Sequence, residues 1–325
     1  MPSNQNYAFM ANNRDESTQI RLSHSVHKIN DSIDIVWCRR RGQPDLSHLH
    51  PEDAVFAKQE FRAFLEGFWT DAARNAVWIN PWQARRIADT KIPQLRAARA
   101  VGLAIPPTLI TNDPDEIAAF VSHHGLGNVV FKTIRPAVWE QAERPPLYTN
   151  TSLVTEDLLA APNDLRLCPG IYQRRVARAA ELRVTVMGDR AWCAEVIAGD
   201  TPGAEVDWRV GQHAMRVRTY ALPPEITNLC IDLVANLGLI FGCIDLILNT
   251  DGDYIFLEVN EMGQFLWIED YCPDALYLEA FVQFLFRMAG SDIVPDGIRL
   301  EEVRNSPDFA AMMRRLAGPG METVI

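Results

Sequence analysis

The sequence predicts a mixed α+β and α/β protein with more than one lobe. Its 325 residues, of which 48% are apolar, can bury a sizeable core and suffice for two or three lobes. Helical and strand-like patterns alternate through the first half, and the second half contains two hairpin patterns. The strongest of these is Asp251-Gly252, which lies between two apolar runs.

We expect consecutive lobes along the chain. Residues 1–90 form an N-terminal lobe, 91–172 a small central α+β lobe, 173–313 a C-terminal lobe with an antiparallel sheet, and 314–325 a tail. The first 30 residues are polar and irregular in pattern, so we expect part of this segment to lack regular structure.

Strand and helix patterns define these lobes. Strands are expected at residues 33–37, 76–79, 108–111, 129–132 and 173–176. Helices are expected at 51–68, at 113–123, near 155–160, and up to Val101 with a break at Pro93. Residues 133–150 contain three prolines and are expected to form a long loop, which is typical of lids and binding loops.

The composition disfavours several classes of partner. The net charge of −11 disfavours nucleic acid and anionic membranes, which bind through positive charge. No run approaches the roughly 18 apolar residues of a membrane span, and the N-terminus lacks a secretory pattern, so the cytoplasm is the default location. The six cysteines form no C-x-x-C pair, which favours reduced, buried thiols.

The Asp251-Gly252 hairpin brings acidic residues together. A type I′ turn at this dipeptide pairs Thr250 with Asp253 and Asp245 with Glu258. Directly opposed residues have Cβ atoms about 5 Å apart on one face of a sheet. Asn260 follows two residues after Glu258 and projects from the same face.

Two carboxylates and an amide in an apolar hairpin favour a divalent metal site. Buried like charges repel, and a hard cation removes that conflict. Oxygen ligands select Mg²⁺ or Mn²⁺ over zinc, and three side chains leave positions open for phosphate oxygens. The alternative is a solvated sheet edge, at which one carboxylate is protonated or exposed.

Two lysines are candidates for contact with phosphate. Lys132 ends an apolar strand, where a charged group is costly unless it meets an anion. Lys91 lies just before the expected helix break. The chain has no Walker-type glycine loop, so the lysines and the metal would bind the phosphates. The alternative for each lysine is a surface position.

The order of these residues resembles the ATP-grasp superfamily over residues 80–290. The matching set is Lys91, Lys132, Tyr172-Gln173-Arg174-Arg175-Val176, Glu181-Leu182-Arg183, Asp245 and Glu258-Val259-Asn260. The resemblance implies an ATP-grasp fold with ATP between the central and C-terminal lobes. It implies that Lys91 and Lys132 contact phosphates, and that Glu181 approaches the ribose. The implied adenine contacts are the backbones of Gln173, Arg174, Arg175 and Val176, and the implied magnesium ligands are Asp245, Glu258 and Asn260.

A narrower resemblance is to the microviridin-type maturases, or graspetide synthetases. It rests on residues 36–40, 94–98, 105–108, 181–186, 207–209 and 257–269. It implies an ADP-forming ligase that binds the leader and core of a ribosomal precursor peptide. The product would be a macrolactone ester with Thr or Ser, or an amide with Lys. The resemblance also implies a homodimer.

The chain departs from that family in two ways. Only 36 residues precede Trp37, so we expect a shortened first lobe. The segment after Lys132 has no glycine, unlike the phosphate flap of many ATP-grasp proteins.

Two arginines are the candidate catalytic residues. Arg183 alternates with Leu182 and Val184 and so faces away from their apolar side, while Arg209 follows Asp207. Fixed cations can stabilise the charge of phosphoryl transfer and of an oxyanion. The alternative for each arginine is a surface ion pair. Asp207 is either a proton acceptor or the structural partner of Arg209.

Two further functions stay open. One is a free-standing ligase for small molecules, similar to glutathione-synthetase-like enzymes. The other is an ATP-binding regulatory protein without catalysis. The extension Gly263–Glu269 after the metal motif favours the peptide maturase.

Overall fold

The computed structural model describes residues 8–12, 17–22, 25–29, 33–39, 44–135, 138–141, 144–199, 201–203, 206–207, 209–210 and 214–317. The chain divides into two compact units. The first comprises residues 1–86, 238–241 and 262–325, and the second comprises 87–237 and 242–261. The first break is close to the expected boundary at residue 90, but residues from 262 onward group with the N-terminal unit. The expected division at residue 172 stays a prediction.

The first unit begins with a small antiparallel sheet. Its strands are β1 (Ala8–Asn12), β2 (Ser17–Leu22) and β3 (Ser25–Lys28). The expectation that residues 1–30 are irregular is therefore wrong for these described segments. The apolar residues of β1 are consecutive, and β2 and β3 are mostly polar, so the two-residue alternation that identifies a strand is weak here.

A parallel strand pair follows in the first unit. β4 (Ile35–Trp37) pairs with β5 (Val77–Ile79), and α1 (Pro51–Asp71) connects them. Both strands and the helix start at Pro51 were predicted, and the structure confirms them. Proline suits this position because the first helical N–H groups have no partner within the helix.

The end of the chain contributes helices to the same unit. They are α8 (Trp267–Tyr271), a short 3-10 helix (Pro273–Ala275), α9 (Tyr277–Met288), α10 (Leu300–Arg304) and α11 (Pro307–Ala317). Phe281 in α9 packs 4.5 Å from Trp37, 5.0 Å from Phe265 and 5.3 Å from Phe241, measured between ring centroids. This aromatic cluster joins segments that are far apart in sequence.

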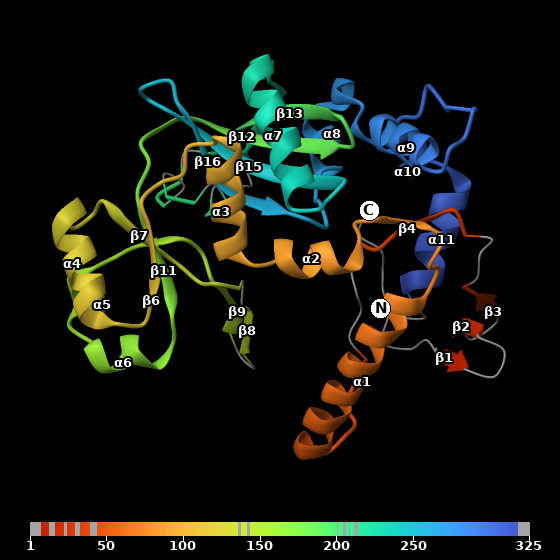
Figure 1. Ribbon diagram of the computed structural model, residues 1–325, viewed down its shortest axis with the longest axis horizontal. Coiled ribbons are helices and arrows are strands. Elements are labelled where there is room, and N and C mark those ends of the chain that lie inside the picture. The colour runs from red at the N-terminus through yellow and green to blue at the C-terminus, as the bar shows by residue number, and fades with distance from the viewer. Residues whose placement is uncertain are drawn as a thin grey trace. The chain divides into compact units, whose positions relative to one another are not determined.

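The second unit contains a four-stranded sheet in the order β10-β7-β11-β6. The strands are β6 (Thr108–Thr111), β7 (Val129–Lys132), β10 (Ser152–Leu153) and β11 (Gly170–Arg174). Helices α4 (Pro114–His124), α5 (Glu156–Leu159) and α6 (Pro162–Leu167) lie beside these strands (Figure 1). The predicted strands 108–111 and 129–132 are confirmed, and Asp113 caps α4 by accepting a hydrogen bond from the Asp115 N–H.

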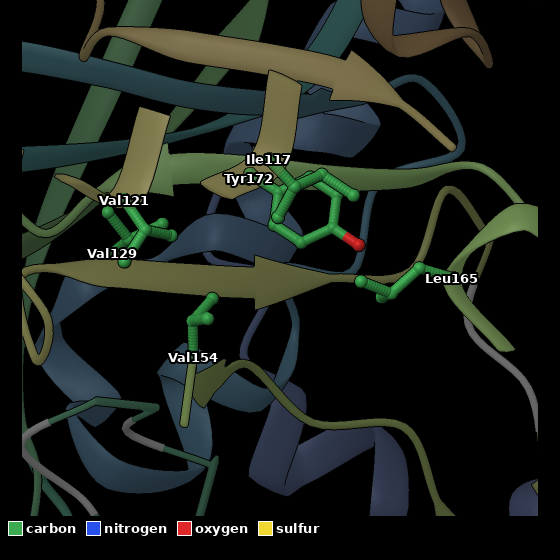
Figure 2. Packing of buried hydrophobic residues seen from close by; sticks show 6 residues of the cluster. All are labelled: Ile117, Val121, Val129, Val154, Leu165 and Tyr172. Atoms are coloured by element: carbon green, nitrogen blue, oxygen red, sulfur yellow. The ribbon is translucent and has the colours of Figure 1, made fainter. Parts of the chain in front are cut away.

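A compact apolar core holds this sheet against its helices (Figure 2). Its buried members are Ile117, Val121, Val129, Val154, Leu165 and Tyr172. The core fixes β7 and β11, and the ends of these strands carry Lys132 and Arg174.

Two further strands replace the expected long loop. β8 (Val138–Gln141) pairs antiparallel with β9 (Arg144–Tyr148). The loop expectation for residues 133–150 is wrong in this part. Prolines at 145 and 146 obscured the strand. A two-stranded ribbon leaves one edge of each strand unpaired, and the pairing is irregular opposite these prolines, between Trp139 and Gln141.

The second sheet of this unit has five strands in the order β14-β13-β12-β15-β16. They are β12 (Arg178–Met187), β13 (Arg190–Ile197), β14 (Arg216–Thr219), β15 (Phe241–Asn249) and β16 (Tyr254–Asn260). Helix α7 (Pro224–Asn236) packs on β12 and β13, and α3 (Lys91–Val101) packs on α7 and β16 (Figure 1).

The helix break before α3 differs from the prediction. Helix α2 (Trp82–Ala88) ends before residues 89–90, and α3 starts at Lys91. Pro93 lies inside the first turn of α3, where its missing N–H would have had no partner within the helix. The expected break at Pro93 is therefore wrong, and Lys91 opens a helix instead of preceding a break.

Two global features agree with the sequence. All six cysteines are free thiols, but only Cys193, Cys230 and Cys243 are buried and Cys168 is exposed, so the expectation of buried thiols is wrong for the others. Within the described residues, no helix is both long enough and apolar enough to cross a membrane.

Candidate active site

The β15–β16 hairpin brings the two predicted carboxylates together. Asp245 pairs directly with Glu258, as predicted. The turn is different, however, because Asn249 donates its N–H to the carbonyl of Asp253 at 2.9 Å. Thr250 therefore lies within a three-residue loop and does not face Asp253.

Gly252 and a bulge explain why Asp245 still faces Glu258, as predicted, although the turn differs from the predicted one. Gly252 closes the turn with φ +93° and donates its N–H to the carbonyl of Asn249 at 3.2 Å. This longer loop shifts the register by one residue near the turn. An irregularity in β16 then leaves Leu257 without a partner, so that Leu246 faces Phe256 but Asp245 faces Glu258. The two departures from the predicted hairpin cancel at the carboxylates.

Each carboxylate forms an ion pair with one of the predicted cations. Asp245 accepts a hydrogen bond from Arg183 of β12 at 2.5 Å. Glu258 accepts one from Lys91 at the start of α3. Arg183 faces Asp245 while Leu182 and Val184 are buried, as the alternation in β12 predicts.

The pKa values of the carboxylates depend on these cations. Burial raises the pKa of Asp245, Arg183 opposes that rise, and Glu258 adds to it. Burial would also raise the pKa of Glu258, but Lys91, Arg209 and Lys132 hold it at about 2. The carboxylate pair is therefore surrounded by positive charge.

Lys132 is held by a directed chain of hydrogen bonds. Its Nζ donates to Gln173 Oε1 at 2.8 Å, and Gln173 Nε2 donates to Thr108 Oγ1 at 2.9 Å. The Thr108 hydroxyl donates to the carbonyl of Pro106 at 2.7 Å. Because that carbonyl can only accept, the chain orients Gln173 with its oxygen toward Lys132. Burial lowers the pKa of Lys132, and nearby Glu258 opposes this effect.

Part of the backbone of the segment predicted to bind adenine forms hydrogen bonds within the protein. The Arg174 N–H donates to the Pro107 carbonyl at 2.9 Å, and the Arg175 N–H donates to the Asn128 carbonyl at 2.7 Å. These two amides are thus already paired. The adenine contact stays a prediction for Gln173, Val176 and the carbonyl groups of the segment.

Glu181, the predicted ribose acid, pairs with Arg178 of the same strand. No pattern in the sequence distinguishes Arg178, because an arginine three residues before an acid is common on any polar face. The ribose contact of Glu181 stays a prediction.

Asp207 acts as the structural partner of Arg209. Its Oδ1 accepts hydrogen bonds from Arg209 Nε at 2.8 Å and from the Arg209 N–H at 3.1 Å. Its Oδ2 accepts the N–H of Thr151 at 3.1 Å. Burial would raise the pKa of Asp207, but Arg209 and these amides lower it, which disfavours the alternative of a proton acceptor. Trp208 lies outside the described residues.

The Arg209 side chain remains accessible. It is 50% exposed. Burial would lower its pKa, but Asp207 raises it, and Glu258 and Asp245 add to that rise, so the guanidinium lies within the field of the carboxylate pair. Arg209 is therefore fixed at one end by Asp207 and open to a ligand.

The residues present fit a magnesium ion. Asn260 lies two residues beyond Glu258 in β16, where strand alternation gives it the same face. Two facing carboxylates and an amide are the oxygen donors that Mg²⁺ or Mn²⁺ prefers. Across the described ranges, no three His, Cys, Asp or Glu side chains gather to hold a metal. Three side chains leave positions in the coordination of such an ion open for oxygens of water or phosphate.

Known structures resemble this fold closely. No protein-family model and no curated protein sequence matches the chain. The macrocyclase MdnC of Microcystis aeruginosa, bound to its precursor peptide MdnA, is 24% identical with a TM-score of 0.72, over 84% of this chain and 83% of that one. A RiPP-associated ATP-grasp ligase of Chryseobacterium gregarium, in complex with ADP and a leader and core peptide, is 24% identical with a TM-score of 0.71, over 88% and 82%. The fold is that of an ATP-grasp ligase.

A third structure shows the family. The macrocyclase MdnB of Microcystis aeruginosa is 30% identical with a TM-score of 0.66, over 84% of this chain and 86% of MdnB. The chain belongs to the graspetide maturases, the ATP-grasp ligases associated with ribosomally synthesised and modified peptides (RiPPs).

Proposed function

We propose that this protein is an ATP-dependent ligase that closes rings in a ribosomal precursor peptide. The observation that carries the proposal is the facing pair Asp245 and Glu258 within a cluster of cations. The cations are Lys91, Lys132, Arg183 and Arg209. The structures of MdnC with its precursor and of the Chryseobacterium ligase with leader and core support a peptide substrate.

The proposed reaction has two steps. A side-chain carboxylate of Asp or Glu in the core peptide attacks the γ-phosphorus of ATP, and the bond to ADP breaks. The resulting acyl phosphate is then attacked at its carbonyl carbon by a Thr or Ser hydroxyl or a Lys amine. The nucleophile loses a proton and inorganic phosphate leaves. Each ester or amide therefore converts one ATP to ADP and phosphate and removes one water from the peptide.

The residues of the site supply charge for both steps. Magnesium or manganese, held by Asp245, Glu258 and Asn260, would draw charge from the phosphate oxygens. Lys132 and Lys91 would neutralise the phosphates. In the structure Lys91 pairs with Glu258, so the proposal requires this lysine to exchange a carboxylate partner for a phosphate.

The two arginines would act on the reacting centre. Arg183 and Arg209 would meet the negative charge of the transferring phosphoryl group and of the tetrahedral oxyanion. Asp207 would hold Arg209 in place through its two hydrogen bonds. The adenine contacts of residues 173–176, the ribose contact of Glu181, a homodimer and a cytoplasmic location complete the proposal, on the basis of the sequence.

Product analysis tests this function. The protein is incubated with ATP, magnesium and a precursor peptide that has a leader and a core rich in Thr, Asp and Glu. We expect ADP, phosphate and a peptide that has lost one water for each bond formed. AMP and pyrophosphate would instead mean an adenylating enzyme. Ligation of small carboxylates with an unmodified peptide would mean a small-molecule ligase, and nucleotide binding without either product would mean a regulatory protein.

A further inference from the structure

Gln94 is a buried amide that binds the backbone of the metal-site strand. It lies in α3 and is 2% exposed. Its Nε2 donates to the carbonyl of Val259 at 2.8 Å and to the carbonyl of Ala88 at 2.5 Å. Its Oε1 accepts the N–H of Val259 at 3.0 Å. One side chain thus pairs with both backbone groups of Val259, as a neighbouring strand would.

These bonds lie at an open edge of the sheet. β16 is the last strand of the five, so one row of its N–H and C=O groups has no neighbouring strand. Gln94 pairs with this row at Val259, and the Ala104 carbonyl, which follows α3, accepts the Phe256 N–H at 2.8 Å. Helix α3 and the segment after it therefore take the place of the missing strand.

The bulge determines which groups of β16 face α3. In a regular strand, the N–H groups that point to one edge are an even number of residues apart. Phe256 and Val259 are three apart, because the extra residue Leu257 reverses the alternation between them. The same bulge therefore aligns Glu258 with Asp245 and turns both backbone groups of Val259 toward Gln94.

This arrangement links both sides of the metal site. Val259 lies between Glu258 and Asn260, so fixing its backbone fixes the strand from which both predicted ligands project. Lys91 precedes Gln94 by three residues, on the same face of α3. The Gln94 side chain thereby fixes the position of Lys91 in α3 relative to Glu258 in β16.

We propose that Gln94 is a positioning residue for the metal and phosphate site, which holds β16 and its ligands in register with Lys91. This inference rests on the proposed function. Groups that orient ligands without touching the metal commonly change metal affinity on the order of tenfold to a hundredfold when they are removed. The expected effect therefore falls on metal–nucleotide binding and not only on stability.

The test replaces the amide with an apolar side chain of similar length. Gln94→Met removes all three hydrogen bonds, and Gln94→Glu keeps the acceptor for the Val259 N–H. Binding of Mn²⁺–ADP and of adenosine is measured by calorimetry on the full-length protein without peptide. We expect Gln94→Met to weaken Mn²⁺–ADP binding about tenfold or more, with Gln94→Glu intermediate and adenosine binding unchanged. Hydrogen exchange of a peptide that contains Val259 should become faster in the same order.

Asn80 offers a matched control in the other unit. It is 1% exposed, donates to the Phe241 carbonyl at 2.7 Å, and accepts the N–H groups of Ile240 and Phe241 at 2.9 Å each. Asn80→Leu removes a similar backbone clamp and should lower the melting temperature while leaving Mn²⁺–ADP affinity unchanged.

The outcomes separate this inference from the proposed function. Wild-type protein that does not bind Mn²⁺–ADP would contradict the proposed function. If the wild type binds Mn²⁺–ADP and both Gln94 variants bind it with the same affinity as the wild type, the positioning role is overturned and the proposed function is not affected. If Gln94→Met does not fold, Gln94→Glu decides the question, because it must then bind Mn²⁺–ADP more weakly than wild type.

Discussion

Lys132 is a buried cation near the carboxylate pair, and its surroundings define its role. Its ammonium group is desolvated, which lowers its pKa, and its Nζ donates a hydrogen bond to the neutral side chain of Gln173. A buried cation is costly unless an anion lies nearby. Glu258 supplies part of that compensation. A phosphate group would supply more, and this would make Lys132 a phosphate ligand and not a lysine of the core.

Lys132→Ala is therefore expected to weaken the binding of ATP but not the binding of adenosine. Loss of a charge-assisted hydrogen bond costs about 1.5–3 kcal/mol, which corresponds to roughly ten- to a hundredfold in ATP affinity. Adenosine has no phosphate and should bind as to the wild type. Gln173→Leu keeps the charge but removes its partner, and should show a smaller loss. Calorimetric titration with both ligands measures this, and equal losses for ATP and adenosine would mean that Lys132 is structural.

The contacts of Arg183 are compatible with a structural role and with a catalytic role. Its ion pair with Asp245 supports a structural role, because an unpaired buried acid destabilises a protein strongly. Its position beside the carboxylate pair supports the proposed catalytic role. The two roles predict similar losses of stability but different losses of rate.

Arg183→Ala should lower single-turnover ring formation by about a hundredfold, the usual scale for one group that stabilises an oxyanion. Nucleotide and precursor binding should persist, since the charge that Arg183 meets arises during the reaction. Arg183→Lys should restore the pair with Asp245 but only part of the rate, because it lacks the planar guanidinium. Melting temperature and single-turnover rate are measured on one preparation. A folded alanine variant with a normal rate would refute the catalytic role.

At the scale of elements, the β15–β16 hairpin depends on Gly252. Its φ of +93° is strained for other residues, although an added Cβ would meet no atom within 4 Å. The cost of a substitution is therefore conformational and not steric. The side chain of Asn249 also supports this loop by accepting the N–H groups of Asp251 at 3.0 Å and Asp253 at 2.7 Å.

Gly252→Ala should therefore lower the free energy of unfolding by about 1–2 kcal/mol, the usual cost of the left-handed region. Gly67→Ala is the matched control, because a Cβ there also meets nothing within 4 Å but the residue lies inside helix α1. That substitution should stabilise by about 0.5–1 kcal/mol. Urea denaturation measures both variants. A loss of the same size at both positions would contradict the role of the turn.

Local patterns predicted most elements but not all of their contacts. The strands at residues 108–111 and 129–132 and the facing carboxylates followed from periodicity and from a turn signal. The bulge at Leu257 has no sequence signal of its own. Gln94 could not be found either, because a glutamine within a helix is usually solvated, and its hydrogen bonds cross 165 residues of sequence.

At the scale of the molecule, the described site residues belong to one compact unit. The ion pairs of Lys91, Arg183 and Arg209 all lie in the unit formed by residues 87–237 and 242–261. The consecutive lobes expected from the sequence stay a prediction. The return of the C-terminal helices to the first unit depends on ring packing between Phe281 and Trp37, and no local pattern reveals that contact.

The net charge of the molecule and the charge of the groups that surround the carboxylate pair have opposite signs. The chain carries a net charge of −11, yet four cations surround the pair Asp245 and Glu258. A local cluster of this kind can bind a nucleotide although the whole molecule repels polyanions. In the proposed function, this cluster transfers a phosphoryl group from ATP to a peptide carboxylate.

Transfer of labelled oxygen tests that claim most directly. A precursor peptide is prepared with heavy oxygen in its Asp and Glu side-chain carboxylates, and the protein is supplied with unlabelled ATP and magnesium. An acyl phosphate intermediate requires one heavy oxygen to leave with phosphate for each bond formed, and mass spectrometry of the phosphate measures it. Glu258→Gln, which removes one charge of the metal site, should abolish the labelled phosphate. Ring closure with unlabelled phosphate, or with label in AMP, would contradict the account.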